Sequence, residues 1–381
     1  MQFIDLSAQQ NRIRDKIEAN IRAVLDHGRY IMGPEVAGLE ERLAGFVGVR
    51  HAVACSSGTD ALLMALMAHG VKPGDAVFTS PFTFVATAEV VSLLGARPVF
   101  VDIDPDSYTM DPGALERAVA GLKHSRPGLA PAGVIAVDLF GLPADYDAIR
   151  AVAEAHGLFV IEDAAQSFGA VYKGRPAGSL ADIACTSFFP AKPLGCYGDG
   201  GMCFTDDDRL AAALTSLRIH GKGGHKYDNV RIGINGRLDT LQAAVLNAKV
   251  DIFPEEVKLR NLAADHYHAL FTNMTGLVRP VVPNGSVSVW AQYSLLAKSG
   301  ALRDALLAGL KQRGIPAAVY YPRPLHLQPA FADLGYKEKD FPVSEDTAAR
   351  IFSIPMHPYL ACSEQDRVAA AIAETLAAQG G

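Results

Sequence analysis

Short apolar runs alternate with amphipathic stretches between residues 51 and 205. Runs with few polar positions are typical of strands that helices cover on both faces. Strands are predicted at 51–55, 76–79, 98–102, 133–138, 158–163, 183–189 and 202–205. Helices are predicted between them at 59–69, 84–94, 112–120 and 146–156. Because strands and helices alternate, the pattern predicts an α/β fold with a mostly parallel central sheet.

The two ends of the chain follow other patterns. Ile13, Ile17 and Ile21 recur at helical spacing near the N-terminus. Helices are predicted at 9–26, 35–47, 206–220 and 237–253, with another beginning at Pro254. A smaller α+β region follows, with strands predicted at 290–296 and 317–321. We therefore predict two domains: a large α/β domain with an N-terminal helical segment over 1–254, and a smaller α+β domain over 255–381.

Composition excludes several classes of function. The net charge is −6, from 35 basic and 41 acidic side chains, so no global attraction to nucleic acid or to an anionic membrane is expected. We see no signal peptide and no apolar run of membrane-spanning length, and we expect a cytoplasmic protein. The five cysteines show no metal-binding spacing, and His266 and His268 face different ways on a predicted helix, so we predict no metal site.

Lys192 is the residue around which the candidate chemistry is arranged. Of the 13 lysines in the chain, it alone follows a predicted core strand and precedes a glycine-rich turn, 195–201. Burial lowers the pKa of an amine, which makes it a better nucleophile. The alternative is an ordinary surface lysine at a junction between strand and turn.

Two further polar groups are predicted at the ends of strands. Ser56-Ser57-Gly58-Thr59 lies between a strand and a helix, where backbone N–H groups and hydroxyls bind phosphate, although a simple helix cap is the alternative. Asp163 ends a buried strand, at the edge where open α/β sheets bind ligands, although it could instead cap a following helix. A phosphate site, an acid for a ring nitrogen and a strand-end lysine are together what pyridoxal phosphate (PLP) requires.

The runs 187–201, 162–167 (Glu-Asp-Ala-Ala-Gln-Ser) and 233–238 (Gly-Ile-Asn-Gly-Arg-Leu) resemble the DegT/DnrJ/EryC1/StrS family, and the likeness extends from Phe3 to Pro358. The resemblance implies a fold-type-I, PLP-dependent aminotransferase of nucleotide-linked keto sugars. The run 192–201 is most similar to the branch that aminates UDP-2-acetamido-2-deoxy-3-oxo-glucuronate for O-antigen sugars. We expect L-glutamate as the amino donor.

The resemblance also implies roles for single residues. Lys192 would bind the cofactor covalently and Asp163 would contact its ring nitrogen. The other expected cofactor contacts are Gly58, Thr59 and Ser187 at the phosphate, Gln166 at the ring hydroxyl, Phe84 on the ring face, and Asn235 from the neighbouring subunit of a homodimer with shared active sites. Phe84 could instead be a core phenylalanine.

Recognition of the sugar is expected from Arg237, Tyr320, Tyr321 and His326. Arg237 would meet the sugar carboxylate, for which a guanidinium is well suited. It could instead form an ordinary ion pair at a helix start, and the two tyrosines could be structural. The loop 221–226 could contact the diphosphate, although it could instead be an ordinary run of charged residues exposed to solvent.

The sequence also allows other functions. The same fold could aminate another UDP- or dTDP-linked keto sugar at C3 or C4. A non-enzymatic PLP-binding regulator and a Rossmann dehydrogenase are less well supported, because no basic arm precedes the domain and no GxGxxG opens the first strand–helix unit. Gly236 stands where relatives often carry serine or tyrosine. Retention of Lys192, rather than histidine, disfavours a dehydratase.

Overall fold

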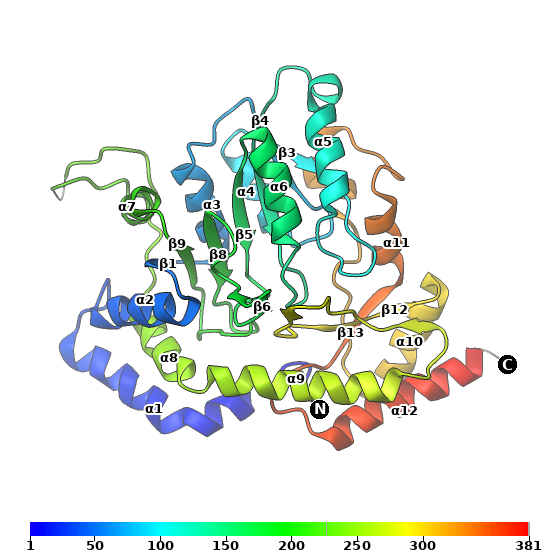
Figure 1. Cartoon of the computed structure of the whole chain (residues 1–381). Helices are drawn as coiled ribbons and strands as arrows, with labels where there is room; N and C mark the ends of the chain where they lie inside the picture. The colour runs from blue at the N-terminus through cyan, green and yellow to red at the C-terminus, as the bar shows by residue number, and fades with distance from the viewer. Residues whose placement is uncertain (226, 380–381) are drawn as a thin grey trace.

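The computed structural model describes residues 1–225 and 227–379. Within them, the central layer is a seven-stranded sheet with the strand order β1-β9-β8-β5-β4-β2-β3 (Figure 1). Its strands are β1 (His51–Cys55), β2 (Asp75–Thr79), β3 (Arg97–Phe100), β4 (Ala130–Val137), β5 (Phe159–Asp163), β8 (Ile183–Ser187) and β9 (Gly201–Thr205). The strands from β8 to β3 pair in parallel, whereas β9 is antiparallel to both β1 and β8. The predicted mostly parallel sheet is confirmed.

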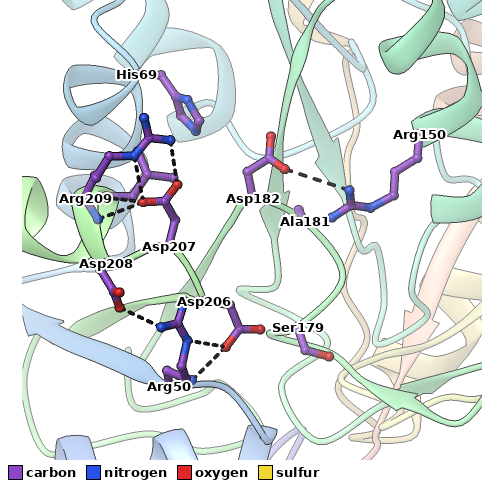
Figure 2. A pocket seen from close by; sticks show the side chains of 11 residues that line it. Arg50, His69, Arg150, Ser179, Ala181, Asp182, Asp206, Asp207, Asp208 and Arg209 are labelled. Atoms are coloured by element: carbon purple, nitrogen blue, oxygen red, sulfur yellow. Dashed lines mark hydrogen bonds and ion pairs between the residues drawn. The ribbon is translucent and has the colours of Figure 1, made fainter.

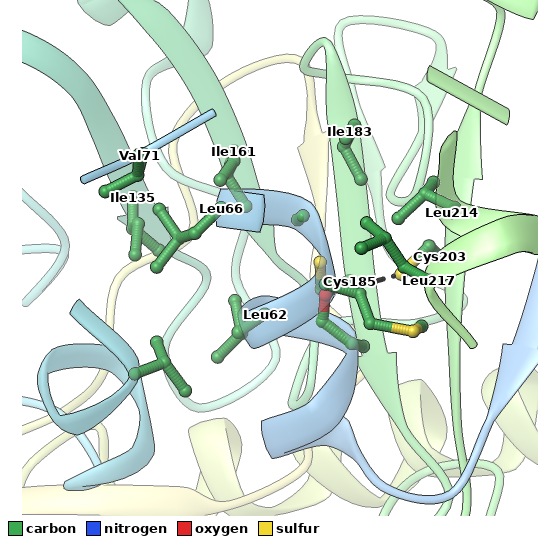
Figure 3. Close-up of a cluster of buried hydrophobic side chains, with 14 of the residues drawn as sticks. Leu62, Leu66, Val71, Ile135, Ile161, Ile183, Cys185, Cys203, Leu214 and Leu217 are labelled. Atoms are coloured by element: carbon green, nitrogen blue, oxygen red, sulfur yellow. Dashed lines mark hydrogen bonds between the residues drawn. The ribbon is translucent and has the colours of Figure 1, made fainter. Parts of the chain in front are cut away.

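Helices cover both faces of this sheet because successive strand side chains point in opposite directions. Ile135, Ile161 and Ile183 pack beneath α3, together with Cys185 and Cys203 (Figure 3). Residues one position away in β2, β4 and β5 pack instead against α5 and α6. The helices that accompany the sheet are α1 (Leu6–His27), α2 (Pro34–Val47), α3 (Gly58–Ala68), α4 (Ala86–Leu93), α5 (Pro112–Ser125), α6 (Tyr146–His156), α7 (Asp208–Leu217) and α8 (Thr240–Val250).

A second core lies in the C-terminal part of the chain, where helices pack on an antiparallel sheet of order β10-β12-β13. The elements here are α9 (Phe253–Phe271), β10 (Leu277–Val278), β12 (Tyr293–Ala297), α10 (Gly300–Gln312), η1 (Leu325–Leu327), η2 (Pro329–Leu334), α11 (Pro342–Arg350), β13 (Ile351–Ile354) and α12 (Cys362–Gln379). A third small sheet joins β6 (Val171–Tyr172) to β7 (Arg175–Pro176) and β11 (Ser286–Val287). No helix of the described residues is long and apolar enough to cross a membrane.

Several predicted boundaries are wrong. The predicted strand 183–189 ends at Ser187, and α8 begins three residues after Arg237. The predicted strand 317–321 is not a strand, because only Ala318 pairs with its neighbour, in one isolated bridge to Ser353. Prolines stand at both ends of this segment and cannot donate to a ladder.

Candidate active site

The chain turns back on itself directly after β8, and this turn carries Lys192. Phe188 donates its N–H to the Gly200 carbonyl at 2.7 Å, and Cys196 donates to the Phe188 carbonyl at 2.8 Å. A Cβ at Gly195 would lie 2.5 Å from the Pro190 oxygen, so only glycine fits there. These contacts end the strand at Ser187 and hold the lysine at the C-terminal edge of the parallel strands.

The Lys192 amine is in an environment that favours its neutral form. Within the described residues it has no hydrogen-bond or ion-pair partner. Burial lowers the pKa of this amine, and the negative charge of Asp163 only partly opposes the effect. A lysine without a structural partner and with a lowered pKa is suited to attack a carbonyl carbon.

Asp163 lies at the end of β5 and is buried. One carboxylate oxygen accepts a hydrogen bond from the Thr87 hydroxyl at 2.8 Å, and the other accepts from the Ala165 N–H at 3.2 Å. Burial raises the pKa of this carboxyl group, and the Thr87 hydrogen bond is the largest opposing influence. A turn rather than a helix follows Asp163, so the alternative that it caps a helix is wrong.

Gln166 and Tyr321 contact each other at the same edge. The Gln166 side-chain oxygen accepts from the Phe140 N–H at 2.8 Å, and its amide donates to the Tyr321 hydroxyl at 3.1 Å. The Tyr321 ring packs edge-on against Phe82, with ring centres 6.1 Å apart. Burial raises the pKa of the Tyr321 hydroxyl, which therefore stays protonated. The structure thus joins one residue predicted for the cofactor to one predicted for the sugar.

The predicted phosphate site forms where the start of α3 meets the end of β8. A Cβ at Gly58 would lie 2.7 Å from the Ser187 Cβ, so glycine permits this close approach. Ser57 caps α3 by accepting from the Asp60 N–H at 3.0 Å. The cap is therefore Ser57, whereas Gly58 and Thr59 form the first turn, whose N–H groups favour an anion. Gly58 and Ser187 are therefore in close contact, and Thr59 follows Gly58 in the first turn of α3.

Phe84 and Asn235 are exposed. The Phe84 side chain is 55% exposed, so the alternative of a core phenylalanine is wrong. The chain around Asn235 runs beside the phosphate site, because Ser56 donates its N–H to the Gly236 carbonyl at 3.1 Å. The described part of the loop 221–226 ends at residue 225, and Lys226 lies outside the described residues.

The predicted sugar-binding residues have three different environments. Arg237 is half-buried, its Nε atom has no hydrogen-bond partner, and no ion pair to it is found among the described residues, so the alternative of an ordinary ion pair is wrong. Tyr320 packs against Tyr321 and Phe3. His326 is buried in η1 and hydrogen-bonds to Glu345 at 3.0 Å, an arrangement typical of a structural histidine.

Other buried polar residues near this edge escaped sequence reasoning. Thr87 lies on a predicted helix with no charge or motif to mark it. Asp138 accepts hydrogen bonds from Ser167 at 2.7 Å and Tyr146 at 2.8 Å, and burial raises its pKa to about 7. Lys249 on α8 is fully buried, so Lys192 is not the only lysine in a core setting. The signal that could have found Lys249 is its place in the run Ala243 to Val250, which is otherwise apolar except for Asn247.

A large cavity, of about 780 Å³, lies at the opposite edge of the sheet (Figure 2). Its charged side chains are paired with one another. Arg50 bonds to Asp208 at 2.8 Å, and Arg209 bonds to Asp207 at 3.0 Å. The cavity therefore offers space but no group comparable with the Lys192 amine.

Comparison with known proteins agrees with this geometry. Residues 11–373 match the model of the DegT/DnrJ/EryC1/StrS aminotransferase family. A UDP-2-acetamido-2-deoxy-3-oxo-D-glucuronate aminotransferase from Pseudomonas aeruginosa is 50% identical over 94% of this chain and 96% of its own. A protein from Geobacillus stearothermophilus named pleiotropic regulatory protein is 43% identical over 98% and 97%.

Solved structures are similar over nearly the whole chain. A DegT DnrJ EryC1 StrS aminotransferase from Brucella abortus is 50% identical, with a TM-score of 0.93 and 98% of each chain covered. A Bacillus subtilis protein, NtdA, solved with bound cofactor PMP, is 28% identical, with a TM-score of 0.90 over 99% of this chain and 85% of its own. The fold-type-I assignment made from the sequence is confirmed by these neighbours. The chain belongs to the DegT/DnrJ/EryC1/StrS aminotransferase family.

Proposed function

We propose that this protein is a PLP-dependent aminotransferase that moves the amino group of L-glutamate to the keto group of UDP-2-acetamido-2-deoxy-3-oxo-glucuronate. The product would serve surface polysaccharide biosynthesis, as in O-antigen formation. The observation that carries the proposal is the half-buried Lys192 amine, which has no partner among the described residues and lies close enough to Asp163 for that charge to act on its pKa. The 50% identical relative named for this activity supports the choice of substrate.

The residues at this edge fit PLP, whose aldehyde forms a covalent link with an amine and whose protonated ring accepts electrons from the bound substrate. Lys192 supplies the amine and Asp163 the buried carboxylate for a ring N–H. Gly58, Thr59 and Ser187 form the anion site. Gln166 would face the ring hydroxyl, and the exposed Phe84 would cover the ring.

The chain's own residues supply proton transfer and orientation. Lys192 Nζ would take up the proton that leaves the α-carbon of L-glutamate. It would move a proton in the opposite direction when the keto sugar is aminated. Asp163, whose carboxylate accepts hydrogen bonds from Thr87 and Ala165, would hold the ring-nitrogen proton throughout.

Arg237 is our candidate for recognition of the sugar carboxylate. Its Nε atom is buried without a hydrogen-bond partner, and a guanidinium left unpaired near a binding site favours a carboxylate ligand. Tyr320 and Tyr321 would line the sugar side of the pocket. His326 would act only indirectly, because Glu345 already occupies its Nε2 atom.

A homodimer with shared active sites is part of the proposal. Apolar side chains around the site remain open to solvent in the single chain, among them Tyr30, Ile31, Phe84 and Phe189. Exposed apolar side chains gathered near a site are typical of an interface. Asn235, also exposed, would contact the cofactor phosphate of the partner. The cytoplasmic location stays a prediction.

The test is turnover with purified protein, PLP, L-glutamate and the 3-keto uronate, monitored by 2-oxoglutarate release. We expect turnover by the wild-type protein and a loss of about 10³-fold or more in Lys192→Ala. Lys258→Met, which changes an exposed lysine on α9, is the matched control. Activity retained in Lys192→Ala would end the assignment, whereas a panel of UDP- and dTDP-linked keto sugars would identify a different substrate.

A regulatory role is the second candidate, because the Geobacillus stearothermophilus relative carries a regulatory name. The acidic net charge opposes direct DNA binding. Retention of the protein on DNA at physiological salt would favour this role, and we expect no retention.

A further inference from the structure

A fully buried lysine lies behind the active-site turn. Lys249 is on α8 and its side chain is fully buried. Lysine is rarely buried without a partner, because removing an ammonium from water is unfavourable. The partners of Lys249 therefore indicate why a lysine stands at this position.

Those partners belong to the turn that carries Lys192. The Lys249 ammonium donates to the Gly195 carbonyl at 2.6 Å and lies over the Tyr197 ring, 4.4 Å from its centre. One face of α8 also presents Gln242, two helical turns earlier, whose side-chain oxygen accepts from the Tyr197 N–H at 2.9 Å. Two side chains of α8 thus hold the backbone at residues 195 and 197.

The same turn is closed from its other side by backbone contacts. Gly195 approaches the Pro190 oxygen so closely that a Cβ would lie 2.5 Å from it. A displacement of residues 195–197 would therefore be transmitted to residues 189–192. Lys192 is three residues from Gly195, and within the described residues its side chain forms no hydrogen bond or ion pair that would hold it in place.

We propose that Lys249 and Gln242 form a clamp on residues 195–197 that sets the position and the burial of the Lys192 amine. Both are positioning residues, since neither is expected to touch substrate or cofactor. The inference rests on the proposed function, because it gives Lys249 a part in the reactivity of Lys192. A fixed nucleophile lowers the barrier of the reaction by avoiding loss of orientation at each turnover.

The groups that face Lys249 are accounted for. Glu256 on α9 and the Cys196 thiol in the turn favour its charged form, whereas burial disfavours it. The Cys196 thiol donates to the Phe188 carbonyl at 3.0 Å and is itself buried. Lys249 therefore supplies the cation of the clamp and Gln242 its amide, and the turn supplies the Gly195 carbonyl and the Tyr197 ring.

The experiment is a pH titration of the absorbance of the PLP-loaded, full-length protein. Lys249→Met keeps the length of the side chain but removes its charge and its donor, and Gln242→Met removes the acceptor without a change of charge. A looser turn admits water to the Lys192 nitrogen, which favours its protonated form, so we expect the titration midpoint to move to higher pH, by roughly half a unit or more. Lys258→Met is the control and should leave the midpoint unchanged.

Two outcomes decide the proposal. Similar shifts of the titration midpoint in both variants support one clamp acting on one turn. The shift in the double variant should then be smaller than the sum of the two single shifts. A lowered melting temperature with an unchanged midpoint in Gln242→Met overturns the proposal, because the residues are then only structural. If Lys249→Met fails to fold, Gln242→Met alone gives the decision.

The clamp and the proposed function can fail separately. If the wild-type protein takes up no PLP, the function fails. The clamp is then tested by acylation of the full-length protein at a series of pH values, with the extent at Lys192 measured by mass spectrometry. The clamp predicts a higher apparent pKa of Lys192 in both variants, and equal profiles would overturn it.

Discussion

The two edges of the central sheet differ in how their charges are paired. At one edge the Lys192 amine has no partner within the described residues, although the buried Asp163 is near enough to influence its pKa. At the other edge Arg50, Arg150 and Arg209 surround a cavity of about 780 Å³, and each forms an ion pair with an aspartate (Figure 2). The first edge holds reactive groups, whereas the second holds mutually neutralised ones.

This difference shows that the volume of a cavity is a poor guide to function in this protein. A paired arginine at a surface contributes little to stability, and its charge is already balanced by the neighbouring aspartate. An amine that is half-buried and unpaired, as that of Lys192 is, is unfavourable for the folded state unless chemistry requires it. Substitutions at either edge of the sheet test this difference.

The largest effect after that of Lys192 is expected from Asp163→Asn. The amide keeps the shape of the side chain but cannot hold the charge of a protonated ring nitrogen in a buried site. We expect kcat to fall by about 10²–10³-fold with the fold intact. Steady-state kinetics and circular dichroism measure the two quantities. A loss below tenfold would show that this carboxylate is not the partner of the ring.

A loss confined to one substrate is expected from Arg237→Gln. Loss of a charge-assisted bidentate contact should lower kcat/KM for the 3-keto uronate by roughly 10- to 100-fold. The matched substrate is the UDP-linked 3-keto sugar with a hydroxymethyl group in place of the carboxylate, for which we expect little change. Equal losses on both substrates would mean that Arg237 does not recognise the carboxylate.

Thr87→Val is expected to act through Asp163. The Thr87 hydroxyl lowers the pKa of Asp163, so its removal raises that pKa and the carboxylate becomes protonated at a higher pH. The acid limb of the pH–activity profile should move to higher pH, with a loss of roughly tenfold on that limb. Thr83→Val, which alters the hydroxyl 3.1 Å behind Thr87, is the control and should shift the limb less. An unmoved limb in Thr87→Val would contradict this role.

The smallest effect is expected at the edge of the sheet that holds the cavity. Arg50→Gln removes an ion pair with Asp208 whose arginine is 58% exposed. Activity should stay within about twofold, and the stability change should be below about 1 kcal/mol, as for most exposed pairs. Kinetics and thermal melting together test this. A tenfold loss of activity would show that the two edges are coupled.

Much of the central sheet could be predicted from the sequence, because its strands are continuous apolar runs. The end of β8 could not, since Phe188 and Phe189 continue the apolar run, and the chain is turned by backbone bonds such as those of Phe188 to Gly200 and Cys196. The segment 317–321 has a strand-like composition but finds a partner at one residue only. The division between 254 and 255 stays a prediction. It falls within the first turn of α9, whose Phe253 packs in the large core while Tyr267 packs in the C-terminal core.

The candidate site was predictable where a residue type has few other uses at its position. Lys192 and Asp163 are charged residues after apolar strands, and the structure places both at one edge. The role of Thr87 and the partners of Lys249 were not predictable, because both depend on contacts between segments far apart in the sequence. The bond between Gln166 and Tyr321 likewise joins residues 155 positions apart.

Reduction of the PLP-loaded protein with borohydride, followed by peptide mass mapping, tests the central claim most directly. Reduction fixes the cofactor on the lysine that holds it. The unpaired, low-pKa amine at the reactive edge predicts one modified residue, Lys192, with Lys249 unmodified in the same sample. Modification of another lysine in place of Lys192, or of none, would contradict the account.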